Sequence, residues 1–131
     1  MENELHVAEL AVREAMGLCR TVQATVDTAV LEKRDRSPVT IADFGSQALV
    51  CRSLAINLPA DPVVGEENAG VLRQPDQSEF LDRIRNELAA RGVTADGETI
   101  CGFMSTFTCI GCGANGEDVT YRDTDWYLFA N

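Results

Sequence analysis

The amino-acid sequence predicts an α+β fold in which long helices pack on the start of a sheet. Apolar residues recur at helical spacing from Glu4 to about Leu31 and again from about Ile41 to Leu58. Two prolines then break the second helix, and Val63-Val64-Gly65 follows as a short β-like run. The length of 131 residues is enough for one domain with a modest core.

The first helix is predicted to present one apolar face to the protein core and to carry no chemistry. Its apolar stripe consists of Leu5, Ala8, Val12, Ala15, Leu18, Cys19, Val22 and Val26. The charged segment Glu32–Arg36 follows, and we expect it to be a solvated loop.

The second helix is expected to begin beside Thr40, whose hydroxyl is suited to cap the first backbone amides. Pro38 favours an extended approach to that helix. Asp43 would lie in the first turn, where the positive end of the helix dipole favours a carboxylate. Taken alone, Asp43 is explained by completion of the helix terminus. The predicted buried face consists of Ala48, Leu49, Cys51, Leu54, Ala55 and Leu58.

Glu66 and Glu67 follow the β-like run directly. Carboxylates at the end of a buried strand are costly unless they are paired or bound to a metal ion. Gly65 would let the backbone approach a ligand closely. A Glu-Glu pair is also common on protein surfaces, so this pair alone leaves a surface role open.

The rest of the chain is predicted to contain two shorter helices and an irregular tail. Asn68–Gln77 is expected to be a polar loop, and Glu79 to about Arg91 a third amphipathic helix ended by Gly92. Thr94 to about Thr106 would be a short fourth helix, and Phe107–Asn131 a loop with room for one strand. The predicted apolar stripe of the third helix is Phe80, Leu81, Ile84 and Leu88.

Charge and hydropathy argue against several classes of function. Eleven basic and 21 acidic residues give a formal net charge of −10, which repels nucleic-acid backbones. No apolar segment is long enough to span a membrane, and the acidic start Met1–Glu4 resembles no signal or transit peptide. We therefore expect a soluble cytoplasmic protein that binds neither nucleic acid nor membrane.

The five cysteines are expected to be free thiols, because they are odd in number and irregularly spaced. Cys109 and Cys112 have the spacing of half a zinc site or of a redox pair. Cys101 would be a third thiolate, but no fourth ligand is apparent, since the one histidine, His6, is distant in sequence. A zinc module is therefore a distant alternative.

Two motifs together resemble a known enzyme family. They are KRDRSPVTIADFGSQ, residues 33–47, and DPVVGEE, residues 61–67. Both are similar to motifs of the Mg²⁺-dependent, lithium-sensitive phosphatases of the inositol monophosphatase superfamily, and above all of the 3'(2'),5'-bisphosphate nucleotidases. The resemblance covers about Glu4 to Gly102. It implies that residues 1–106 form the N-terminal part of a layered αβαβα fold and that 107–131 are a divergent tail, truncated or aberrant.

The resemblance also implies roles for three carboxylates. Glu66 would ligate the catalytic Mg²⁺, Glu67 would act behind it or on another metal ion, and Asp43 would hold and deprotonate the attacking water. The implied substrate is the small molecule 3'-phosphoadenosine 5'-phosphate, hydrolysed to AMP and phosphate. Such chemistry depends on positioning and charge neutralisation, which metal ions provide. The substrate-binding residues stay unassigned, with Lys33, Arg34 and Arg36 suggested by charge alone.

The sequence departs from the family after the glycine-rich stretch 111–117. The family's next motif, Asp-Pro-Ile-Asp-Gly-Thr, supplies two further metal carboxylates, and Asp123-Thr124-Asp125 lacks its proline and Gly-Thr turn. The chain would then be a truncated gene model or splice product, a short protein that kept only a binding role, or one that gains ligands from a partner chain. We expect the chain alone to be inactive. The alternatives are a fragment of an inositol polyphosphate 1-phosphatase or inositol monophosphatase-type enzyme, and a non-catalytic interaction module.

Overall fold

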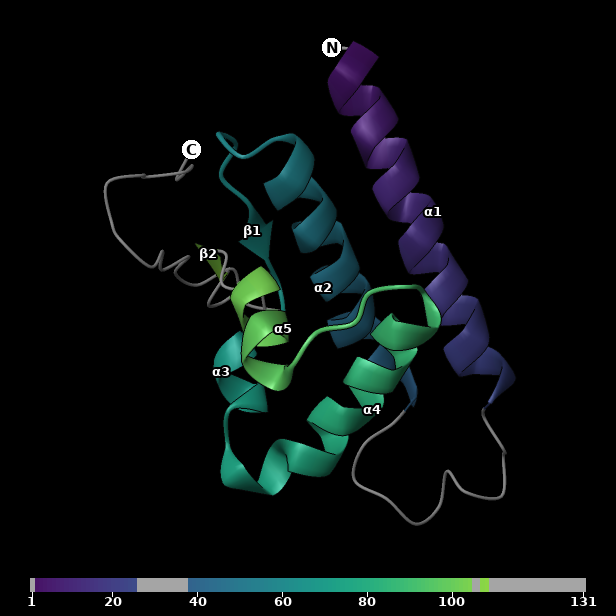
Figure 1. The fold of residues 1–131 in the computed structure, drawn as a ribbon, viewed down its shortest axis with the longest axis vertical. Helices are drawn as coiled ribbons and strands as arrows, with labels where there is room; N and C mark the ends of the chain where they lie inside the picture. Colours follow the sequence, from purple (N-terminus) through teal and green to yellow (C-terminus); the bar gives the residue numbers. More distant parts are fainter. Residues whose placement is uncertain (1, 26–37, 105–106, 109–131) are drawn as a thin grey trace, which may run out of the picture.

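The computed structural model of the chain describes residues 2–25, 38–104 and 107–108. These residues form mainly helices, with one parallel sheet of two short strands (Figure 1). The elements in chain order are α1 (Glu2–Ala24), α2 (Pro38–Asn57), β1 (Val64–Gly65), α3 (Ala69–Leu72), the 3₁₀ helix η1 (Pro75–Gln77), α4 (Ser78–Ala90), α5 (Gly97–Phe103) and β2 (Phe107–Thr108).

Helices α1 and α2 lie side by side and run in opposite directions (Figure 1). At their contact, the fully buried side chain of Leu18 lies over Gly45. The Phe44 ring then meets the Phe80 ring of α4 edge to face, with 5.3 Å between centroids. One apolar core thus joins α1, α2 and α4.

The apolar stripe predicted for the first helix is correct for Leu18 and Val22 but wrong at its N-terminal end. The buried residues of α1 are Val7, Ala11, Leu18 and Val22, whereas Leu5 is 72% exposed and Val12 is 52% exposed. Helix α1 carries apolar residues on two faces, and contact with α2 buries the face centred on Ala11 and Leu18. Of the predicted helical residues, 26–31 lie outside the described part of the chain.

The predicted start of the second helix is also wrong. Helix α2 begins at Pro38, so Thr40 lies inside the first turn and is not the N-cap. Proline is favourable there, because its fixed φ suits a helix and its missing N–H costs no intrahelical bond. The predicted buried face is correct for Ala48, Leu49 and Cys51, but Ala55 is exposed.

The segment predicted to be a polar loop contains α3 and η1. Asn68 caps α3, and its Oδ1 accepts a hydrogen bond of 2.8 Å from the Gly70 amide. Ala69 and Leu72 are buried against the core. These two apolar residues explain why the segment folds back instead of staying in solvent.

Helix α4 confirms its prediction, with Phe80, Ile84 and Leu88 buried. Gly92 ends it with a φ of 81°, and its amide bonds to the Ala89 carbonyl while the Val93 amide bonds to the Leu88 carbonyl. This is the Schellman arrangement, including the apolar contact of Val93 with the core. The predicted fourth helix is shorter than expected and is α5.

The sheet pairs Val64 with Phe107 and Gly65 with Thr108 in parallel register. Parallel neighbours need a crossover connection, and α3, α4 and α5 provide it. Helices with a minimal sheet agree with the predicted α+β class and are compatible with part of a phosphatase fold. None of the helices in the described part of the chain is both long and apolar enough to cross a membrane.

Candidate active site

The three carboxylates predicted to do chemistry come from two elements that are neighbours in space. Asp43 is exposed and lies in the second turn of α2, so its predicted place in the first turn is wrong, because the helix begins at Pro38. Glu66 and Glu67 directly follow β1, with Glu66 exposed and Glu67 half-buried. Gly65 before them is buried, which fixes the end of the strand against the protein.

Gln47 connects these two elements. Its side-chain Nε2 donates a hydrogen bond of 2.8 Å to the Glu67 carbonyl, and its Oε1 accepts one of 2.8 Å from the Glu67 amide. Gln47 lies four residues after Asp43, so both side chains project from the same face of α2. The pair of bonds therefore holds Glu67 beside the part of α2 that carries Asp43.

The negative charges of Asp43 and Glu66 both act on the carboxyl group of Glu67. The pKa of Glu67 is raised above its ordinary value, first by partial burial and then by the negative charges of Asp43 and Glu66. A bound cation would stabilise such a group of carboxylates, because it would reduce the repulsion between their negative charges. The arrangement is therefore suited to positive charge.

No protein-family model matches the chain. Among curated proteins, the chain is 44% identical over 73 residues to a 3'(2'),5'-bisphosphate nucleotidase of Emericella nidulans, covering 56% of this chain and 21% of the relative. It is 39% identical over 105 residues to 3'(2'),5'-bisphosphate nucleotidase 1 of Arabidopsis thaliana, covering 76% and 30%. It is 40% identical over 87 residues to 3'(2'),5'-bisphosphate nucleotidase 1 of Candida albicans, covering 63% and 23%.

The chain is related to the 3'(2'),5'-bisphosphate nucleotidases. It spans between 21% and 30% of the length of these three relatives, so the match concerns part of such a protein. This relationship confirms the family resemblance of the two motifs.

The donor chemistry of the nucleotidase-related site fits Mg²⁺, although the ligand set is partial. Hard divalent cations take carboxylate oxygens, and Mg²⁺ commonly uses one or two protein carboxylates together with water and phosphate. Glu66 and Glu67 offer such oxygens. Within residues 2–25, 38–104 and 107–108, no group of three or more His, Cys, Asp and Glu side chains is arranged to hold a metal ion.

Several predicted site residues lie outside the described part of the chain. These are Lys33, Arg34, Arg36, Cys109, Cys112 and the stretch Asp123–Asp125. The zinc alternative therefore stays a prediction. Cys19 is a free thiol, which agrees with the expectation for this residue.

The sequence did not predict the contact of Gln47 with Glu67, although Gln47 closes the first motif. Its spacing of four residues from Asp43 was the available signal, since it places both on one helix face. Its partner Glu67 is 20 residues away, and no local pattern predicts that contact.

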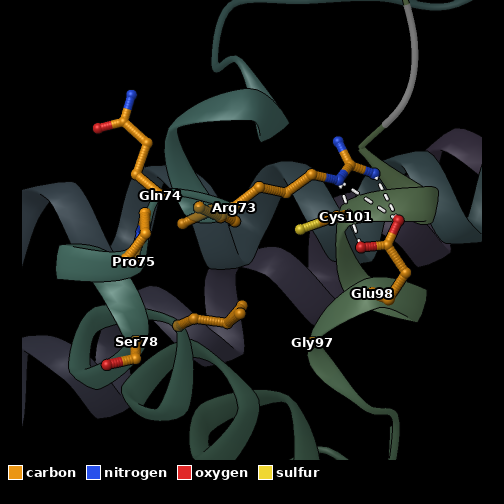
Figure 2. A pocket seen from close by; sticks show the side chains of 9 residues that line it. Arg73, Gln74, Pro75, Ser78, Gly97, Glu98 and Cys101 are labelled. Atoms are coloured by element: carbon orange, nitrogen blue, oxygen red, sulfur yellow. Dashed lines mark hydrogen bonds and ion pairs between the residues drawn. The ribbon is translucent and has the colours of Figure 1, made fainter.

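A hollow of about 500 Å³ lies between α3, η1, α4 and α5 (Figure 2). Across it, the Arg73 guanidinium donates to the Glu98 carboxylate, with an Nη2–Oε1 distance of 2.9 Å. None of the three candidate carboxylates lines this hollow. Its walls are Leu72, Arg73, Gln74, Pro75, Ser78, Leu81, Gly97, Glu98 and Cys101.

Proposed function

We propose that this chain carries part of the active site of a Mg²⁺-dependent phosphomonoesterase that converts 3'-phosphoadenosine 5'-phosphate to AMP and phosphate. The observation that supports it most is the hydrogen-bonded connection of Gln47 to Glu67, which brings the Glu66-Glu67 pair beside Asp43. The names of the relatives favour a bisphosphate nucleotide over an inositol phosphate as substrate. The helices and two-stranded sheet would belong to a layered αβαβα fold.

In this proposal each carboxylate has a distinct task. Asp43, exposed on α2, accepts a hydrogen bond from the attacking water and takes its proton. Glu66 would provide an oxygen ligand to Mg²⁺, and Glu67 would add negative charge next to Glu66. When bound, Mg²⁺ neutralises phosphate charge and lowers the pKa of coordinated water. The water oxygen would bond to phosphorus while the bond from phosphorus to the 3'-oxygen breaks, and the leaving 3'-oxygen would take a proton from solvent to become the 3'-hydroxyl of AMP.

We further propose that the 131 residues alone release little phosphate. The sequence lacks the Asp-Pro-Ile-Asp-Gly-Thr motif that supplies two more metal carboxylates in the family. A partial ligand set leaves the developing charge on the phosphoryl group poorly neutralised.

The test measures Mg²⁺ binding by calorimetry and phosphate release from 3'-phosphoadenosine 5'-phosphate by the purified chain. We expect weak Mg²⁺ binding that Glu66→Gln removes and that Glu14→Gln, an exposed change on α1, leaves intact. Absence of Glu66-dependent binding contradicts the ligand role. Robust Mg²⁺-dependent phosphate release, abolished by Glu66→Gln, contradicts the proposal that the chain alone is inactive.

A non-catalytic interaction module is the second candidate, and the surface of α1 favours it. Leu5, Val12 and Met16 form an exposed apolar row along that helix. Such a row would suit dimerisation with a second copy of the chain. Size-exclusion chromatography with light scattering measures the oligomeric state of the chain. A dimer that Val12→Glu converts to a monomer supports this second candidate. A monomeric wild-type chain contradicts it.

A further inference from the structure

We propose that Gln47 is a positioning residue: its side-chain amide fixes the backbone of Glu67 and so sets where the Glu66 and Glu67 carboxylates lie relative to Asp43. The metal-binding consequence rests on the proposed function. The positioning itself rests on the hydrogen bonds between α2 and the segment after β1.

The two hydrogen bonds need a primary amide. The peptide group of Glu67 presents one donor and one acceptor, and the Gln47 amide matches both at 2.8 Å. If the Gln47 amide were reversed, its NH₂ group would face the Glu67 N–H and its oxygen would face the Glu67 carbonyl. The Glu67 peptide group therefore determines the orientation of the Gln47 amide. A side chain of equal length without these groups keeps the packing and loses the connection.

The position of Gln47 explains why its hydrogen bonds to Glu67 matter for the candidate site. Strand β1 has two residues, so its ladder with β2 is short and the chain after Gly65 needs another support. Gln47 supplies that support one helical turn from Asp43. The backbone of Glu67 is thereby tied to the helix that carries the proposed water-activating carboxylate.

A loosened Glu67 backbone is expected to weaken cation binding without unfolding the chain. Some residues orient metal ligands by hydrogen bonding to them without touching the metal ion. Mutation of such residues typically lowers metal affinity by about 10- to 100-fold. A merely structural role for Gln47 would lower thermal stability and leave the Mg²⁺ affinity of the folded chain unchanged.

The test uses the full chain with Gln47→Met, which keeps a similar length and removes both hydrogen-bonding groups. Two measurements are made on folded protein: hydrogen exchange of the Glu67 backbone amide by NMR, and Mg²⁺ affinity by calorimetry. We expect faster exchange of the Glu67 amide and Mg²⁺ binding about 10- to 100-fold weaker. Ser46→Ala is the matched control, since the Ser46 hydroxyl bonds within α2 to the Asp43 carbonyl, and it should change neither.

Wild-type exchange and wild-type Mg²⁺ affinity in Gln47→Met would overturn the inference. If the wild-type chain shows no Glu66-dependent Mg²⁺ binding, the proposed function fails and exchange of the Glu67 amide alone tests the positioning role. Faster exchange in Gln47→Met supports that role, and unchanged exchange overturns it. Should Gln47→Met not fold, exchange of the Gln47 side-chain amide in the wild type decides. Slower exchange than that of exposed Gln74 supports the inference, and equal exchange overturns it.

Discussion

Leu18 of α1 packs directly onto Gly45 of α2, at a distance that leaves no room for a β-carbon. A methyl group built on Gly45 would lie 2.9 Å from Leu18 Cδ1 and 3.1 Å from Cδ2. Leu18 is fully buried, so its side chain has little freedom to move aside. Gly45, next to Phe44 in the first motif, therefore sets how closely the two long helices approach.

Gly45→Ala is expected to destabilise the chain. Alanine in a helix gains up to about 1 kcal/mol over glycine, but overpacking a buried contact costs about 1–3 kcal/mol. The overpacking should outweigh the gain. Gly102→Ala in α5 is the matched control, because no atom lies within 4 Å of its added methyl group, and it should stabilise slightly. Urea unfolding measures both, and equal changes in the two variants would contradict the packing argument.

Gly92→Ala should destabilise the chain for a different reason. The space around Gly92 is open, but its φ of 81° is a left-handed conformation that costs a residue with a β-carbon about 1–2 kcal/mol. Gly92→Asn should lose less, since asparagine tolerates this conformation. An unfolding free energy of Gly92→Asn equal to or lower than that of Gly92→Ala would contradict the Schellman ending of α4.

Asp96 should make stability depend on acid pH. Hydrogen bonding from Thr99 lowers the pKa of the Asp96 carboxyl, first through the Thr99 side chain and then through the Thr99 amide, which donates to Asp96 Oδ1 at 2.7 Å. Because the folded pKa lies below the unfolded one, the stabilisation is present above the ordinary aspartate value and is lost as pH falls through the folded pKa.

Thermal unfolding from neutral to acid pH measures this loss. Asp96→Asn keeps a side-chain oxygen to cap α5 but cannot titrate, so its melting temperature should fall less between the two conditions. An identical fall in wild type and variant would show that Asp96 does not contribute.

The described thiols should differ in reactivity. Burial raises the pKa of the Cys101 thiol, with a smaller opposing effect from the Arg73 charge, so little thiolate is present at neutral pH. Cys51 is also buried, whereas Cys19 is half-buried. Iodoacetamide should therefore modify Cys19 before Cys51 and Cys101, as peptide mass mapping would record. Equal rates for Cys19 and Cys101 in folded protein would contradict the buried placement.

Local sequence patterns predicted much of the helical structure. The apolar spacing of Phe80, Ile84 and Leu88 and the stop at Gly92 were sufficient for α4, because helix period and capping depend on residues within one or two turns. The two motifs likewise indicated the family, which the relatives confirm. The roles of the individual carboxylates remain predictions.

Tertiary structure decided what local patterns leave open. Helix α1 has two apolar faces, and only contact with α2 selects the one carrying Ala11 and Leu18. The bonding of Gln47 to Glu67 joins residues 20 apart, beyond the reach of any helical or strand period. The sequence by itself thus determined the presence of the long helices, the stop of α4 at Gly92 and the candidate carboxylates, because these depend on near neighbours. The buried face of α1 and the approach of Glu67 to α2 depend on which surfaces meet, and the packed chain decides that.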